Sequence, residues 1–475
     1  MKGFGAFVRK VLYAVGANLL SLIVSVLSTL IVPAFLGEAV DQYGYLQIYI
    51  FYANYLTYLH FGLCDGFFLR DGGKHYGELN KPLYSGQFCL LTLVQTLLAL
   101  LIALGGVLFA PSAEYRFIFL LIALHNVIYL PRRMLEYILQ MTNRIREYAL
   151  AATSGRILYG ASIVFIALFG ARDFRLFVWA AVLSDVLPLL LLLWSCRDIL
   201  RTRPAPLRVL LPEIKTNLRV GIKLLVANVS SMLVTGIMQW GIQTKWDVGT
   251  YGRVSFTLSV SNLVLAFINA VALVLYPTLR RSDGKLLGGI YHVLRNLLMI
   301  PCLGALVLYY PLELILSAWL PQYAESMRYM AILFPMCVYA AKNTLLVQTY
   351  LNVYRMERVS LQVNLVGVAV AALTTVLSVF LAESLTLAMM CIVINQMVRC
   401  ILGELLLARR AGLSVSRDIL LEIGMTVLFI GVSWFIGGWL GEGLYLLGFA
   451  LYLLFKRRDL RQALGSMRTL RNGEA

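Results

Sequence analysis

The fold is decided by the stretch 220–281, which reads VGIKLLVANVSSMLVTGIMQWGIQTKWDVGTYGRVSFTLSVSNLVLAFINAVALVLYPTLRR. It repeats, in altered form, the pattern of residues 16–70: an Asn-x-x-Ser start, a long apolar run, a Tyr-Gly pair and a second apolar run that closes on arginine. The Asn-to-Tyr separations are 25 and 23 residues, and the Tyr-to-Arg separations are 27 and 29. Two halves built alike explain this agreement.

A second echo lies further along the chain. Residues 140–147 read QMTNRIRE and residues 351–358 read LNVYRMER, so that Arg144 and Arg355 correspond at a separation of 211 residues. All the offsets fall between about 205 and 212 residues, which indicates one duplicated unit. The sequence therefore predicts two structural repeats.

Composition sets the class of protein. Hydrophobic residues make up 60% of the chain and charged residues 14%, against roughly 45–50% and 25% in soluble proteins. A spanning helix needs roughly 20 apolar residues, and the sequence predicts an all-α membrane protein with fourteen such helices. They lie near 11–36, 44–66, 83–110, 116–141, 148–170, 175–195, 220–243, 252–278, 287–320, 327–352, 359–381, 384–408, 419–438 and 441–455.

These helices group into four predicted parts. An N-terminal six-helix lobe covers 1–196, a cytoplasmic interlobe linker 197–219 and a C-terminal six-helix lobe 220–408. Two extra helices and a basic cytoplasmic tail follow at 409–475. An even number of helices in each lobe predicts lobes related by an axis along the membrane normal, with a path for something at their interface.

Basic residues predict the orientation. Of the 41 lysines and arginines, 31 fall in the predicted inner segments, six in the outer loops and four within the membrane, which places both termini in the cytoplasm. The net charge of +17 is therefore mostly a topology signal, with anionic lipid headgroups as its partner. The basic residues form no single patch, so nucleic acid binding is not expected.

Other chemistry finds no support in the sequence. The seven cysteines form no CxxC pair and the four histidines have no ligand spacing, so we expect no metal and no cofactor. No GxxxxGK[ST] loop is present. Apart from an ATPase partner, energy would come from an ion gradient, the membrane potential or the substrate gradient.

Charges inside the predicted membrane segments are the candidate site residues. In the first half these are Arg156 and Asp185, whose similar depth favours a structural ion pair slightly over a substrate role. Asp65 and Arg70 end the second helix. We interpret them as part of a salt-bridged cytoplasmic turn, with an inner gate as the alternative.

The second half has an apparent excess of positive charge. Lys342, Arg399 and Arg295 lie within helices, and Glu404 is the only acid near them in the sequence. A cationic interior is expected to bind an anionic ligand. Lys342 follows Pro335 by about two turns, where a kink opens the helix toward a cavity in this interpretation. Two further cations extend the expected path at its inner and outer mouths: Lys223 and Arg253.

The quoted stretch 221–281, together with FGLCDGFFLRDGGKHYGEL at 61–79, resembles the polysaccharide-exporting branch of the multidrug/oligosaccharidyl-lipid/polysaccharide (MOP) exporter superfamily. It is most similar to bacterial O-antigen and capsule repeat-unit flippases. The resemblance implies a MATE-like architecture of two six-helix lobes with two additional helices. It implies a flippase of the bacterial inner membrane that moves polyprenyl-pyrophosphate-linked oligosaccharide outward by alternating access, in cell-envelope polysaccharide biosynthesis. Other polysaccharide-assembly proteins would be partners.

The resemblance also implies a cationic cavity for the pyrophosphate, which Lys342, Arg399 and Arg253 would line. Three alternatives remain open. A lipid II flippase of the same superfamily is hard to separate by sequence. A cation-coupled multidrug antiporter would want an acidic cavity. A membrane-embedded glycosyltransferase or ligase would need catalytic carboxylates or histidine near a membrane face and usually a sizeable outer loop.

Overall fold

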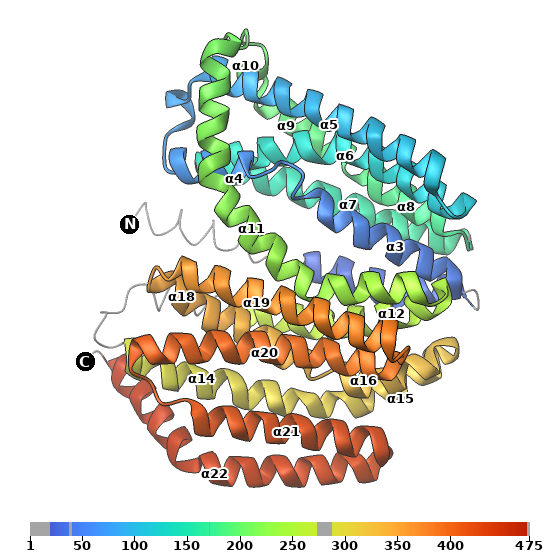
Figure 1. Ribbon diagram of the computed structural model, residues 1–475, viewed down its shortest axis with the longest axis vertical. Helices are drawn as coiled ribbons and strands as arrows, with labels where there is room; N and C mark the ends of the chain where they lie inside the picture. The colour runs from blue at the N-terminus through green and yellow to red at the C-terminus, as the bar shows by residue number, and fades with distance from the viewer. Residues whose placement is uncertain (1–19, 38–39, 171, 273–286, 473–475) are drawn as a thin grey trace. The chain divides into compact units, whose positions relative to one another are not determined.

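The computed structural model of the protein describes residues 20–37, 40–170, 172–272 and 287–472, and within them the regular structure is entirely helical (Figure 1). The chain divides into two compact units, Met1–Val229 and Ser230–Ala475. Their boundary falls inside α11 (Leu207–Lys245), a single helix of 39 residues. The expected all-α fold is confirmed, and the predicted linker 197–219 is itself partly helical.

The N-terminal unit is built from helices joined by short connections. In order they are η1 (Leu27–Ile31), α2 (Val32–Leu36), α3 (Val40–Leu56), α4 (Leu63–Asp71), η2 (Tyr76–Glu78), α5 (Lys81–Phe109), α6 (Ala113–Met141), α7 (Ile145–Leu168), α8 (Phe174–Ser184), α9 (Val186–Ser195) and α10 (Arg197–Leu200). The long α6 packs against α3, α5, α8 and α9. It is the central helix of this unit.

The C-terminal unit contains more broken helices. In order they are α12 (Val248–Ala272), α14 (Leu287–Gly304), η3 (Ala305–Leu308), α15 (Tyr309–Trp319), η4 (Pro321–Tyr323), α16 (Ala324–Leu333), α17 (Met336–Lys342), η5 (Asn343–Gln348), α18 (Thr349–Val353), α19 (Glu357–Thr375), η6 (Val376–Leu381), α20 (Leu385–Ala411), α21 (Ser416–Phe435) and α22 (Gly438–Asn472). The last two helices pack on each other, and they also contact α16 and α14 respectively.

Ten helices in the described ranges are long and apolar enough to span a membrane, or eleven if the bent pair Pro321–Leu333 and Met336–Val353 forms one span. A shorter apolar helix covers Leu20–Leu36. The count of fourteen spans stays a prediction. The bent pair turns by 46° at its break, next to Pro335, where the sequence predicted a kink.

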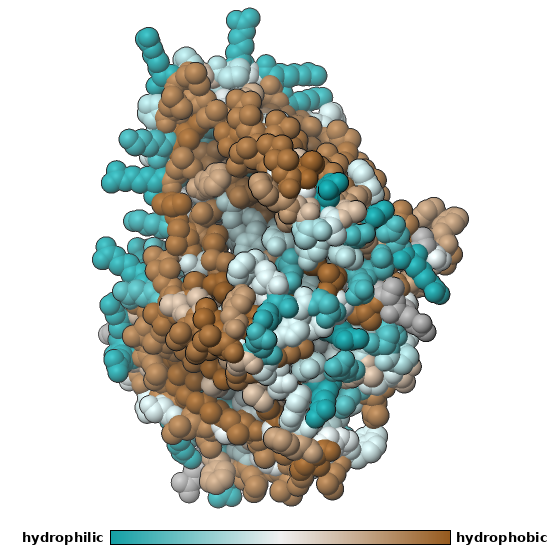
Figure 2. All heavy atoms as spheres, turned by 45° about the vertical axis from the view of Figure 1, so that its right-hand side comes forward, coloured by the Kyte–Doolittle hydropathy of each residue, from teal (hydrophilic) through white to brown (hydrophobic). Residues whose placement is uncertain are grey.

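The helix flanks are apolar toward the outside, as a bilayer requires. On α5, leucines recur at helical spacing and are 53–64% exposed: Leu97, Leu100, Leu101, Leu104 and Leu108. The opposite face buries polar groups, and Gln95 Nε2 donates to the carbonyl oxygen of Leu59 at 2.7 Å. Figure 2 shows apolar residues over much of the visible surface, with long hydrophilic side chains projecting along its left edge.

The predicted duplication is visible in the backbone. Asn143 and Arg355, 212 residues apart, both adopt a left-handed conformation, with φ of 60° and 53°. After each, the next amide donates five residues back: Arg144 to the carbonyl of Leu139 at 2.9 Å, and Met356 to that of Leu351 at 2.7 Å. The two halves therefore end corresponding helices with the same turn.

The tyrosines of the repeat occupy equivalent places. Tyr43 is the fourth residue of α3 and Tyr251 the fourth of α12, and each is at most 1% exposed. Two other parts of the repeated pattern, Asn18 and 276–281, lie outside the described residues. The matching tyrosines support an internal repeat at the level of packing.

Within the N-terminal unit, α4 and the first half of α11 meet backbone to backbone. A Cβ added to Gly66 would lie 1.9 Å from the carbonyl oxygen of Asn217, and one added to Gly221 would lie 1.9 Å from that of Gly62. No side chain fits at these positions, since real Cβ atoms do not approach other atoms so closely. Glycine at 62, 66 and 221 thus fixes where the long helix crosses α4.

Candidate functional site

Lys342, the cation expected to bind substrate, is completely buried in the C-terminal unit. Its Nζ donates to Glu404 of α20 and, at 2.6 Å, to Glu422 of α21. Both carboxylate side chains are at most 2% exposed. Lys342 is therefore neutralised inside the protein.

Arg295 belongs to the same cluster. Its guanidinium lies 2.7 Å from Glu404, 2.8 Å from Glu422 and 3.1 Å from Asp418. Asp418 also accepts a hydrogen bond from Lys456 of α22 at 2.6 Å. Lys456 also lies 3.1 Å from Asp459 on its own helix. Three cations and three carboxylates from five helices make up the set that we call the inner ion cluster: Arg295, Lys342, Lys456, Glu404, Asp418 and Glu422.

The inner ion cluster corrects the sequence interpretation of a helix set with unbalanced charge. Glu404 is not the only acid near Lys342 and Arg295, because α21 supplies Glu422 and Asp418 from outside the predicted six-helix lobe. Pairing across distant helices was not visible in the sequence. The two extra helices thus carry the charges that complete the core of this unit.

Arg399 on α20 differs from these cations. It is 5% exposed, and no carboxylate among the described residues lies within ion-pair distance of it. Its Nε donates to Asn364 at 3.0 Å, and a terminal nitrogen donates to Ser231 Oγ at 2.5 Å. Its aliphatic stem packs beside Gly367, where an added Cβ would lie 3.6 Å away. Neutral partners leave its charge uncompensated.

The other expected path cations lie nearer the surface. Arg253 on α12 is 3.3 Å from Glu325, with 37% of its side chain exposed. Lys223 and Arg156 are both exposed. Their predicted roles in substrate binding stay predictions.

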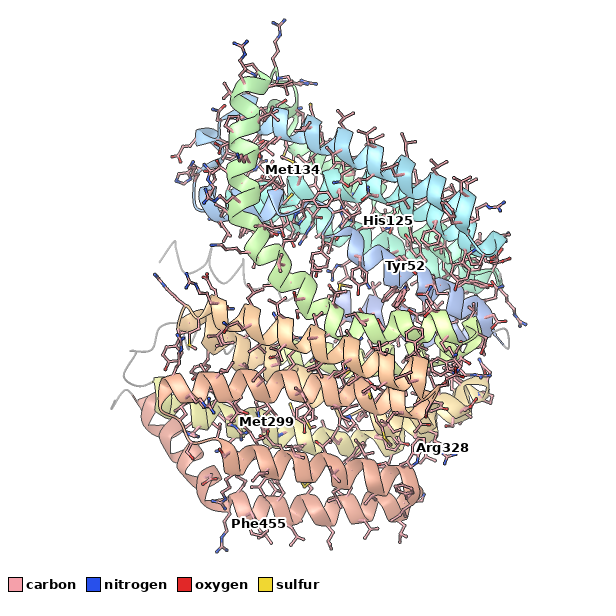
Figure 3. The ribbon with its side chains drawn as sticks, in the orientation of Figure 1. Tyr52, His125, Met134, Met299, Arg328 and Phe455 are labelled. Atoms are coloured by element: carbon pink, nitrogen blue, oxygen red, sulfur yellow. The ribbon has the colours of Figure 1, made fainter. Side chains whose placement is uncertain are left out.

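The N-terminal unit holds a second ionic cluster around Asp185. The Oδ2 atom of Asp185 lies 2.9 Å from Nε2 of His125, whose Nδ1 is 2.8 Å from the hydroxyl of Tyr49. Arg132 contacts the other oxygen of Asp185. Figure 3 shows His125 on α6, within the helices of this unit. The ion pair suggested between Arg156 and Asp185 is therefore wrong.

Two arginines of this cluster lie inside the predicted helix 116–141. Arg132 and Arg133 are nine and eight residues before the end of α6. Arg132 is 3.2 Å and Arg133 2.9 Å from the buried Glu136. The i+3 and i+4 spacing of Arg and Glu was a signal for this pairing. We call this set the α6 ion cluster: His125, Arg132, Arg133, Glu136 and Asp185.

Asp65 and Arg70 do not pair with each other. Asp65 is 4% exposed and accepts a hydrogen bond from Tyr137 at 3.1 Å. Arg70 donates to Glu213 at 2.5 Å across the contact of α4 with α11. The turn interpretation holds for Asp71, which accepts from Lys74 at 2.5 Å. An inner gate at Asp65 and Arg70 stays a prediction.

The described cysteine, histidine and acidic side chains do not indicate a metal site. All seven cysteines are free. Among the described residues, no group of three or more His, Cys, Asp and Glu side chains is arranged to hold a metal ion.

The chain has no match to any protein-family model and none to a curated protein sequence. Its structure is similar to that of lipid II flippase MurJ in an inward closed conformation, with a TM-score of 0.63, 12% identity and coverage of 95% of this chain and 99% of that one.

A second similar structure is an inward-facing multidrug resistance MATE family transporter of the MOP superfamily. The TM-score is 0.61 at 15% identity, covering 83% of this chain and 94% of that one. An outward-facing structure of such a transporter gives a TM-score of 0.51 at 15% identity, covering 85% and 94%. The protein therefore has the fold of MOP-superfamily transporters.

Proposed function

We propose that the protein is a flippase that carries a polyprenyl-pyrophosphate-linked oligosaccharide across the bacterial cytoplasmic membrane by alternating access. The observation that carries this proposal is Arg399, a buried guanidinium without a described carboxylate partner. Buried charges are normally paired, because an unpaired one is costly to desolvate. An anionic substrate group would supply the missing charge.

The chemistry of arginine suits this substrate. Its guanidinium fork donates two parallel hydrogen bonds to phosphate oxygens. Asn364 and Ser231 hold only neutral dipoles against Arg399, so its positive charge is retained. Pyrophosphate and sugars cannot cross hydrocarbon unaided, since each unpaired polar group costs several kcal/mol. A cationic, polar surface inside helices replaces their lost hydration.

Lys342 and Arg295 contribute less to this proposal than the sequence suggested. Their charges are already matched by Glu404, Glu422 and Asp418. We therefore assign the pyrophosphate contact first to Arg399, because Arg253 also has a carboxylate partner, Glu325. This assignment depends only on which buried cations already have carboxylate partners.

A second candidate function is lipid II flipping. The similarity to MurJ extends over nearly the full length of both chains, which favours this candidate. A cation-coupled drug antiporter is less well supported, because the buried acids Glu404, Glu422 and Asp185 are each paired with cations. These acids do not form an unpaired acidic surface.

The test is translocation of a fluorescent polyprenyl-pyrophosphate oligosaccharide in liposomes. Arg399→Gln keeps a similar length but removes the charge, and we expect it to slow translocation roughly ten- to a hundredfold, as loss of a charge-assisted hydrogen bond implies. Arg399→Lys should retain part of the rate, because it keeps the charge without the fork.

The matched control is Arg410→Gln, which removes an exposed arginine from the last turn of α20, the helix that carries Arg399, and should leave the rate near that of the parent. Elution in size-exclusion chromatography checks folding of each variant. Faster movement of a lipid II probe would favour the second candidate. Export of cationic drugs without movement of either lipid would overturn the proposal.

A further inference from the structure

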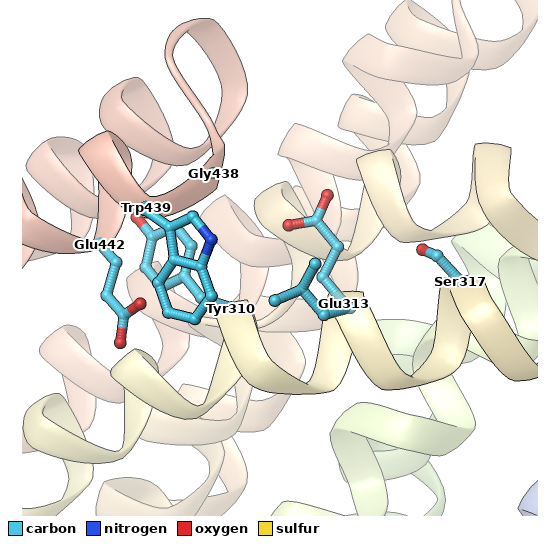
Figure 4. A pocket seen from close by; sticks show the side chains of 7 residues that line it. Tyr310, Glu313, Ser317, Gly438, Trp439 and Glu442 are labelled. Carbon is cyan, nitrogen blue, oxygen red and sulfur yellow. The ribbon is translucent and has the colours of Figure 1, made fainter.

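A cavity of about 260 Å³ lies in the C-terminal unit between α15 and the start of α22. Arg399 is not among the residues that line it. Figure 4 shows Glu313 and Ser317 rising from α15, with Trp439 and Glu442 coming from the first turns of α22. Tyr310 also lines the cavity. Two acids and two aromatic rings therefore meet at one small opening.

The turn that builds this cavity depends on two glycines. Gly437 and Gly438 have φ of 63° and 56°, a left-handed region that glycine adopts without strain. They reverse the chain between α21 and α22 within two residues and bring Trp439 over α15. Gly441 then lets α22 approach Tyr310, since its added Cβ would lie 3.3 Å from that ring.

The side chain of Tyr310, which lines the cavity, is held in place by its neighbours. Tyr310 is 3% exposed, and its hydroxyl is 3.0 Å from Ser433 Oγ on α21. Its ring also packs edge-on to that of Tyr309 at 5.1 Å between centroids. Trp439, in contrast, is 74% exposed. The cavity therefore has one buried aromatic side chain and one that is accessible to a ligand.

The charge of the cavity is negative in a chain whose net charge is +17. Glu313 and Glu442 both line it, and neither makes an ion pair with any described lysine, arginine or histidine. Ser317 lies in the last turn of α15, where the helix dipole adds partial negative charge. Carboxylates with aromatic faces are the surroundings that an organic cation prefers.

The position of the cavity indicates where that cation comes from. Glu313 lies six residues before Trp319, where the candidate span Tyr291–Trp319 ends, and Gly438 begins the span Gly438–Arg457. At 1.5 Å per residue this is about 9 Å from the helix end, near the boundary between the headgroup region and the hydrocarbon core. Leu314 and Ile315 beside it are 53% and 59% exposed, as in a lipid-facing surface.

We infer that this cavity binds an organic ammonium group, with the primary ammonium of an aminophospholipid headgroup as its source. A primary ammonium donates three hydrogen bonds, and the carboxylates of Glu313 and Glu442 and the hydroxyl of Ser317 are the acceptors among the lining side chains. The indole of Trp439 covers its methylene carbons. The site is independent of what the protein transports.

The test is lipid retention in native mass spectrometry, with the full chain in nanodiscs of phosphatidylethanolamine mixed with phosphatidylglycerol or phosphatidylcholine. We expect the parent to retain phosphatidylethanolamine over both other lipids. Glu313→Gln with Glu442→Gln keeps shape and removes both charges, and should lower this retention about tenfold, as loss of a close charge pair implies. Glu325→Gln, an acid outside the cavity that pairs with Arg253, is the matched control.

Thermal unfolding in detergent gives a second measurement that distinguishes the sources. Protection by phosphatidylethanolamine but not by millimolar ethanolamine supports the lipid, and protection by ethanolamine alone supports the ammonium site with a soluble ligand. Equal retention of all three lipids, retention unchanged in the double variant, or protection by Mg²⁺ alone would overturn the inference. Because none of these readouts measures transport, failure of the flippase proposal would not affect them.

Discussion

The two units share a repeated turn but differ in how they hold buried charge. In the inner ion cluster of the C-terminal unit, the side chains of Arg295, Lys342, Lys456, Glu404 and Glu422 are 0–2% exposed and that of Asp418 is 13% exposed. In the α6 ion cluster of the N-terminal unit, Glu136 is 3% exposed, His125, Arg132 and Asp185 are 11–16% exposed and Arg133 is 28% exposed. The first network is therefore more deeply buried than the second.

This difference separates charges that hold the fold from charges that remain accessible. A dry network with every charge matched fastens helices together, and losing one member leaves an uncompensated charge. A network open to solvent loses less when one member is removed, because water screens what remains. Duplicated helices therefore do not imply duplicated roles for their charges.

The largest expected effect comes from Lys342→Met. It leaves Arg295 as the one described cation within ion-pair distance of the buried carboxylates of Glu404 and Glu422, and we expect a loss of about 3–5 kcal/mol in the free energy of unfolding. Chemical denaturation in a mild detergent measures this loss. Adding Glu422→Gln to the same chain should restore part of the stability, because the charges are matched again.

Lys342→Met also tests the sequence interpretation of this residue. A variant that unfolds like the parent and yet fails to move the lipid would show that Lys342 acts on the substrate, as the sequence suggested, and not in the fold. The contrast between the inner ion cluster and the α6 ion cluster would then not hold at Lys342.

A smaller effect is expected from Arg132→Met in the α6 ion cluster. Asp185 keeps His125 and Glu136 keeps Arg133, so each carboxylate retains a partner. We expect a loss of about 1–3 kcal/mol in the same denaturation measurement. A loss equal to that of Lys342→Met would mean that burial makes no difference between the two ion clusters. That outcome would contradict the contrast drawn from their exposed fractions.

The smallest effect is expected at Asp198, on α10 outside the spans. Burial raises the pKa of Asp198, but hydrogen bonds from Lys81 and Tyr76 and the charge of Lys81 outweigh it, so the net pKa lies below the ordinary value. A carboxyl with a lowered folded pKa adds stability above its unfolded pKa of about 4, and this stability is lost as pH falls through the folded value.

Asp198→Asn should therefore be less stable than the parent at neutral pH and converge with it below about pH 4. The check is thermal unfolding of both proteins as a function of pH. Because the side chain of Asp198 is 40% exposed, the difference should be screened by salt. A difference that persists unchanged at low pH would contradict the assigned cause.

Much of the fold was open to prediction because bilayers leave few choices for the backbone. The apolar runs form helices, and the repeated turn lies at Asn143 and Arg355, within one residue of the sequence pairing of Arg144 with Arg355. The helix predicted at 116–141 is α6, which accommodates Pro131 in its interior. Arg132 and Arg133 of this helix pair with Glu136.

The site was less predictable because depth along a helix is only one coordinate of a side chain. Arg156 and Asp185 share a depth, but Ala151 and Gly155 form the buried face of α7 and leave Arg156 outside. Glu422 lies 80 residues from Lys342, on a helix that the sequence treated as additional. Partners of buried charges follow from helix rotation and packing, which periodicity does not specify.

The glycine contact between α4 and α11 has a consequence for recognising relatives. Leucines on the lipid-facing flanks can be exchanged for other apolar residues with little change in packing, whereas Gly62, Gly66 and Gly221 have no room for a single methyl group. A chain that keeps this helix crossing must therefore keep a G-x-x-x-G pair and a third glycine, which lies 155 residues after the second member in this chain. At 12–15% identity to the similar structures, three sterically required glycines can serve as a search signature where the average similarity of the sequence cannot.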